Sequence, residues 1–114
     1  MLKIYHNPRC NKSRTTLNII KEAEVEVEVV EYLKKPFTEN ELRDIITKLN
    51  LPVSYLVRKS EEIYKTSYKG KDLSDDEWIK VLVENPKLIE RPIVINEDGE
   101  AILGRPPENV NKLL

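Results

Sequence analysis

The first thirty residues alternate between patterns typical of strands and of a helix. Residues 2–5 alternate between apolar and other side chains, which predicts a short strand. Residues 11–23 carry apolar side chains at helical spacing, and residues 25–29 alternate between valine and glutamate. The apolar positions of the predicted helix are Leu17, Ile20 and Ala23. Strand, helix and strand predict a βαβ unit whose two strands are parallel.

The middle of the chain contains two helix-start signals. Thr38 with Glu41, and Ser74 with Glu77, have the spacing of a capping box and precede apolar residues at helical spacing. Residues 65–72, between the predicted helices, are polar and predict a loop.

The end of the chain predicts a hairpin and a last helix. Residues 92–95 and 101–103 are short apolar runs, and the Asp98-Gly99 turn signal lies between them. Residues 106–108 contain two prolines and a glutamate, which favour a helix start. We expect this last helix to bury Val110, Leu113 and Leu114.

Composition limits the classes of protein to which the chain can belong. Its 114 residues fit a single domain covering positions 1–114. The net charge of -1 gives no general basic surface for nucleic acid, and the apolar runs are too short to span a membrane. The N-terminal residues read as a strand and not as a signal peptide, so we expect a cytoplasmic protein without nucleic-acid or membrane partners.

The single cysteine, Cys10, lies where a predicted loop enters a helix, and it excludes an internal disulfide or a multi-cysteine metal site. A helix N-terminus favours an anion and lowers the pKa of a thiol placed there. Arg9, Lys12 and Arg14 add positive charge nearby. The alternative is an inert structural cysteine, but inert cysteines have apolar neighbours, and these are missing. Cys10 is therefore predicted to be a reactive thiolate.

His6 and Ser13 flank the cysteine. His6 is the only histidine, and either acid–base catalysis or shaping of the loop would explain it. The hydroxyl of Ser13 can donate a hydrogen bond to the sulfur. Since Ser13 stands where a second cysteine would close a disulfide, an oxidised or adducted Cys10 needs an outside thiol, such as glutathione, or a partner protein.

Three arginines lie where predicted elements meet loops: Arg58, Arg91 and Arg105. Guanidinium groups match tetrahedral oxyanions with paired donors. Each of them alone is typical of a solvated surface residue, and their spacing does not bring them together without the fold. A thiolate beside several such groups would suit attack on an oxyanion.

Four segments, taken in order, resemble the glutaredoxin-coupled arsenate reductases. They are residues 6–14 (HNPRCNKSR), 56–59 (LVRK), 91–94 (RPIV) and 104–106 (GRP). The resemblance implies an α/β thioredoxin/glutaredoxin-like fold. It implies a four-stranded mixed sheet with a helical insertion, at about residues 38–90, between the second and third strands.

The resemblance also implies roles for single residues. Cys10 would be the nucleophile on arsenate, His6 and Ser13 would help to keep it ionised, and a cis peptide bond would precede Pro92. The implied substrate-binding residues are Arg58, Arg91, Arg105, Asn11 and Lys12.

The implied cycle has three steps. Cys10 displaces a hydroxyl group of arsenate, glutathione attacks and reduces the arsenic, and glutaredoxin removes the glutathione as arsenite leaves. Glutathione is then a co-substrate and glutaredoxin a partner. No metal and no bound organic cofactor is expected.

Three other functions remain open. Spx-type regulators of the same fold bind RNA polymerase, but they typically have Cys-x-x-Cys where this chain has Ser13, and they lack an arginine matching Arg105. A one-cysteine glutaredoxin-like thiol oxidoreductase would not need three arginines. A related reductase acting on another oxyanion or on a thiol compound also remains open, because phosphate-like anions share the charge and shape of arsenate.

Overall fold

The computed structural model describes all of residues 1–114, which form two compact units. One unit contains Met1–Lys35 together with Arg91–Leu114, and the other is Pro36–Glu90. No helix in either unit has the length and the apolar character needed to cross a lipid bilayer.

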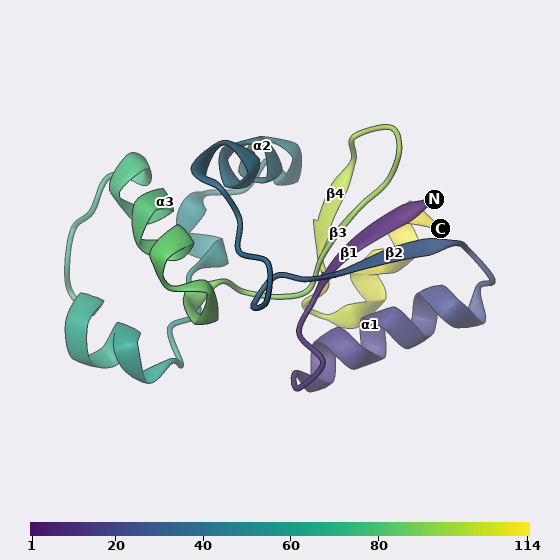
Figure 1. Cartoon of the computed structure of the whole chain (residues 1–114), viewed down its shortest axis with the longest axis horizontal. Coiled ribbons are helices and arrows are strands. Elements are labelled where there is room, and N and C mark those ends of the chain that lie inside the picture. Colours follow the sequence, from purple (N-terminus) through teal and green to yellow (C-terminus); the bar gives the residue numbers. More distant parts are fainter. The chain divides into compact units, whose positions relative to one another are not determined.

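The first unit is built on a four-stranded mixed sheet (Figure 1). Its strands are β1 (Leu2–His6), β2 (Val27–Glu31), β3 (Ile93–Ile95) and β4 (Ala101–Leu103), in the order β2-β1-β3-β4. β1 runs parallel to β2 and antiparallel to β3, and β3 and β4 form the predicted hairpin. The predicted mixed sheet is confirmed, as is the position of the helices between its second and third strands.

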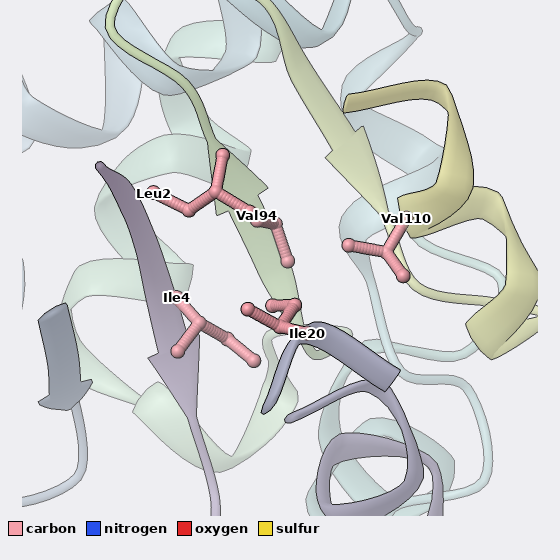
Figure 2. Packing of buried hydrophobic residues seen from close by; sticks show 5 residues of the cluster. All are labelled: Leu2, Ile4, Ile20, Val94 and Val110. Carbon is pink, nitrogen blue, oxygen red and sulfur yellow. The ribbon is translucent and has the colours of Figure 1, made fainter. Parts of the chain in front are cut away.

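Two helices pack together on one face of this sheet. They are α1 (Asn11–Glu22), which lies below the strands in Figure 1, and a C-terminal 3-10 helix (Pro107–Leu113), the yellow ribbon next to α1. Between helices and sheet lies an apolar cluster, drawn in Figure 2, that consists of Leu2, Ile4, Ile20, Val94 and Val110. This cluster fixes α1 against β1 and thereby fixes the loop that joins them.

Some details at the edges of these elements differ from the predictions. Ala23 ends α1 and is exposed, and Glu24 follows it with a φ of 59°. β2 consequently begins at Val27, two residues later than the alternation suggested. Leu114 is 45% exposed, so its predicted burial is wrong, because the last helix ends at Leu113 in 3-10 geometry.

The second unit confirms both predicted capping boxes. In α2 (Glu39–Leu49) the N–H of Glu41 donates to Thr38 Oγ1 over 3.1 Å, and the N–H of Thr38 donates to the carboxylate of Glu41 over 3.0 Å. Ser74 and Glu77 make the same reciprocal pair at the start of α3 (Asp75–Glu84).

One predicted loop of this unit is partly helical. Tyr64–Tyr68 form a single turn of π-helix inside the stretch that polarity had marked as a loop from residue 65 onward. The rings of Tyr64 and Tyr68 lie 6.4 and 5.8 Å from that of Trp78 in α3. Aromatic packing between segments distant in sequence gives this turn its structure, and local polarity did not indicate it.

Replacing Thr38 by alanine is expected to lower the free energy of unfolding by about 1 kcal/mol, because the N–H of Glu41 loses its acceptor. Urea unfolding followed by circular dichroism measures this. Thr47→Ala is the matched control, since Thr47 lies within the same helix and its hydroxyl only bonds back to the carbonyl of Arg43. Equal losses in the two variants would contradict a capping role for Thr38.

Candidate active site

The register of the sheet brings distant segments to the carboxyl end of β1. Tyr5 lies opposite Ile93, and Ile93 lies opposite Leu103. Because both pairings are antiparallel, the residues just before β3 and just after β4 lie at the end where β1 leaves the sheet. The loop of residues 7–10 follows β1 at this same end. The cysteine loop, Arg91 and Arg105 therefore emerge from one edge of the sheet.

Cys10 is the N-cap residue of α1. Its backbone is extended, with φ of -91° and ψ of 124°, and its N–H donates to the carbonyl of Asn7 over 3.0 Å. Its own carbonyl accepts the first helical hydrogen bond from Arg14. Cys10 as a residue is partly exposed and therefore lies near the protein surface. The prediction that the cysteine stands at a helix start is confirmed.

The surroundings of Cys10 lower its pKa below the ordinary value of a thiol. Burial by itself raises the pKa, but the N–H of Ser13, the guanidinium of Arg91 and the N–H of Lys12 together outweigh it. The thiol makes no conventional cap hydrogen bond, yet these donors lie close enough to stabilise the anion. The geometry thus favours a thiolate, the form in which cysteine is a nucleophile.

The Ser13 hydroxyl is turned toward His6 and Asn7. Its Oγ lies 2.6 Å from His6 Nδ1 and accepts the N–H of Asn7 over 3.1 Å. The expected hydrogen bond from this hydroxyl to the sulfur is replaced by one from the backbone of Ser13. Ser13 therefore joins the loop before Cys10 to the first turn of α1.

His6 is 6% exposed and lies at the end of β1. Burial lowers its pKa, Glu31 acts in the opposite direction, and Lys21 and Arg14 lower it further. A neutral imidazole is thus favoured at pH 7, and any influence on Cys10 passes through Ser13 and the loop. Ser13 Oγ accepts the N–H of Asn7 in either tautomer of His6. If His6 Nδ1 carries no proton, the Ser13 hydroxyl donates to it; if Nδ1 is protonated, Nδ1 donates to the hydroxyl, whose own proton is then free.

Arg91 and Pro92, which immediately precede β3, belong to the surroundings of Cys10. Arg91 is 8% exposed, its guanidinium hydrogen-bonds the sulfur of Cys10, and its peptide bond to Pro92 is cis. The cis bond agrees with the prediction, and a second cis bond, between Arg105 and Pro106, was not predicted.

Gly104, just after β4, packs tightly against Pro92 and Thr16. A Cβ atom at this position would lie 2.7 Å from both Pro92 Cγ and Thr16 Oγ1, so no side chain fits there. The end of β4 is thereby held against Pro92 and α1.

The other predicted binding residues occupy different places. Arg105 is half-buried just after Gly104, and its carbonyl accepts from Asn109. Asn11 and Lys12 are exposed in the first turn of α1. Arg58 belongs to the unit Pro36–Glu90, where its Nε is buried 3.7 Å from Glu61 Oε1. Contact of these four residues with an oxyanion stays a prediction.

No group of three or more histidine, cysteine, aspartate or glutamate side chains has an arrangement that could hold a metal ion. The polar groups beside the sulfur are N–H donors and a guanidinium, which attract anions. The site therefore combines a nucleophilic sulfur with groups that stabilise negative charge.

The sequence matches a known protein family over almost its whole length. Residues 5–113 match the sequence model of the ArsC family. The chain belongs to the ArsC family. It is 47% identical to the uncharacterized protein YfgD of Escherichia coli, over 99% of this chain and 96% of that one. It is 43% identical to an arsenate reductase of Haemophilus influenzae, over 97% of each chain.

Solved structures of the family have the same architecture. The arsenate reductase from Vibrio cholerae superimposes on this ArsC protein with a TM-score of 0.93 at 42% identity, over 99% of this chain and 97% of that one. The thioredoxin-like fold predicted from the sequence is therefore confirmed.

Two features of this ArsC site were missed in the sequence. Asn7 is buried, accepts the N–H of Arg9 on its side chain and accepts the N–H of Cys10 on its carbonyl, so it shapes the loop. Thr16 is fully buried on α1, in line with Ser13 and Ile20. Positions 13, 16 and 20 have helical spacing, but two of them are polar, and a search for apolar side chains alone passes over them.

The lowered pKa of Cys10 has a direct test. Because only the thiolate is alkylated, the rate of reaction with iodoacetamide against pH should have its midpoint below about 8.5, the value of a free cysteine. A midpoint at or above that of glutathione, measured in parallel, would contradict the electrostatic description of the site.

Proposed function

We propose that this protein is an arsenate reductase that converts arsenate to arsenite through an adduct on Cys10. The proposal rests above all on the Cys10 sulfur, which is held at the start of α1 among N–H donors and the guanidinium of Arg91. Whole-chain similarity to proteins named arsenate reductase supports the choice of arsenate among oxyanions.

In the first step the thiolate of Cys10 attacks arsenic. A sulfur–arsenic bond forms and a hydroxyl group of arsenate leaves, taking up a proton to become water. Arg91 offsets repulsion between the thiolate and the oxyanion, and it is already in place before the substrate arrives. We propose that Arg58 and Arg105 bind the oxyanion as well, and that Asn11 and Lys12 contribute through their backbone N–H groups at the helix start.

Reduction of the adduct needs outside thiols, because the chain has no second cysteine. We propose glutathione as the co-substrate and glutaredoxin as the partner. Arsenic gains two electrons, the two outside thiols lose them by forming a mixed disulfide, and arsenite and free Cys10 are released. A cycle of this kind suits the reducing cytoplasm, where we place the protein.

The test is an assay with arsenate, glutathione, glutaredoxin, glutathione reductase and NADPH. Oxidation of NADPH that depends on both the protein and arsenate is the expected result, with phosphate in place of arsenate as the control for oxyanion choice. If arsenate causes no turnover with glutathione and glutaredoxin or with a thioredoxin system, the proposed function is wrong.

A further inference from the structure

Four positively charged side chains surround Cys10 in the sequence and the fold, and two of them are engaged inside the protein. Arg91 is buried against the sulfur. Arg14 donates from its guanidinium to the carbonyl of Pro8 over 3.0 Å. Arg91 is thus engaged with the sulfur, and Arg14 with the backbone of the loop before it.

Arg9 and Lys12 are different. Both side chains are exposed, and neither makes a hydrogen bond or an ion pair within the protein. Arg9 immediately precedes Cys10, and its backbone is fixed by the side chain of Asn7. Lys12 lies in the first turn of α1, where its own N–H faces the sulfur. Two solvated cations thus lie within two residues of the nucleophile, on backbone that is held by hydrogen bonds.

We propose that Arg9 and Lys12 bind the carboxylates of the small acidic thiol that resolves the Cys10 adduct. This inference rests on the proposed function and names the residues that select the resolving thiol. Arg91 already faces the sulfur, where an oxyanion must bind, whereas Arg9 and Lys12 face solvent, from which a second reactant approaches. A tripeptide such as glutathione carries carboxylates several bonds away from its sulfur, which suits cations placed beside the nucleophile.

The charges matter because the protein as a whole does not attract anions. Its net charge is -1, so any positive potential beside Cys10 comes from charges near it, such as Arg9 and Lys12. Exposed ion pairs are weak and screened by salt, and each is worth roughly a two- to fivefold change in binding. The expected effect is therefore a preference among thiols, in rate and in KM, that disappears at high ionic strength.

The test uses an exchange reaction that needs no arsenate. The thiolate of Cys10 attacks one sulfur of oxidised glutathione, the S–S bond breaks, one glutathione leaves as its thiolate and the other stays on Cys10. The same reaction with the uncharged 2-hydroxyethyl disulfide gives the reference rate. In Arg9→Gln/Lys12→Gln we expect the ratio of the two rates to fall about 3- to 10-fold at low salt.

The matched control is Lys21→Gln/Lys112→Gln, which removes two exposed charges from the last turns of α1 and of the C-terminal helix. The control should keep the wild-type ratio. Two results would overturn the inference. One is an unchanged ratio in the Arg9/Lys12 variant, whether or not turnover with glutaredoxin or the KM for arsenate changes. The other is an equal loss in the control. Because Cys10 exchanges disulfides whether or not arsenate is its substrate, failure here is distinct from failure of the proposed function.

Discussion

Replacing Cys10 by serine is expected to abolish arsenate-dependent oxidation of NADPH, with a loss of at least about 10³-fold. A serine hydroxyl stays protonated at neutral pH, so the donors that stabilise the thiolate have no anion to hold. The substitution changes one atom of a partly exposed N-cap residue, and serine is itself a favoured N-cap residue. The fold should therefore survive while the chemistry is lost.

Two measurements separate lost chemistry from lost structure. The urea midpoint of Cys10→Ser should equal or exceed that of the wild type, because the new hydroxyl can accept from an N–H of the first turn. Mass spectrometry should find no covalent adduct after incubation with oxidised glutathione. Arsenate turnover above about one per cent of the wild-type rate would refute the adduct mechanism.

Local signals in the sequence predicted those elements that depend on neighbouring residues. The capping boxes at Thr38 and Ser74 involve groups three residues apart, so sequence spacing alone fixes them. The alternation in β1 and the turn at Gly99, whose φ is 84°, are equally local. The turn Tyr64–Tyr68 was missed because its rings pack on Trp78, a contact that polarity along the chain does not encode.

In the candidate site, too, features that depend on neighbouring residues were predictable, and those that depend on distant contacts were not. The position of Cys10 at a helix start follows from Asn7, Pro8 and the helical pattern, and these lie within a few residues of it. The contact of Arg91 with the sulfur depends on the pairing of β1 with β3, residues about ninety positions apart. The family resemblance indicated Arg91 as an oxyanion-binding residue, but not this contact. The direction of the Ser13 hydroxyl depends on the burial of His6 at the end of the sheet, so the expected contact with sulfur was not the one formed.

The largest effect outside Cys10 is expected at Arg91. In Arg91→Met the buried guanidinium is lost while most of the side chain's apolar length remains. The pKa of Cys10 should then rise, because Arg91 both hydrogen-bonds the sulfur and attracts its charge. A raised pKa leaves less thiolate at pH 7, so the alkylation midpoint and the rising limb of the activity profile should both move to higher pH. At pH 7 we expect kcat/KM for arsenate to fall about 10²- to 10³-fold.

Arg14→Met is the matched control, since it removes an exposed guanidinium that hydrogen-bonds the Pro8 carbonyl of the same loop and does not contribute to lowering the pKa of Cys10. Its alkylation midpoint should stay close to that of the wild type. Arg91→Lys keeps the charge but loses the planar pair of donors, so its midpoint should lie between those of Arg91→Met and the wild type.

If Arg91→Met lost activity at every pH with its alkylation midpoint unmoved, Arg91 would act on the oxyanion alone and would not stabilise the thiolate. If both quantities stayed at wild-type values, the electrostatic basis of the site would be wrong, because no other buried cation contributes to lowering the pKa of Cys10.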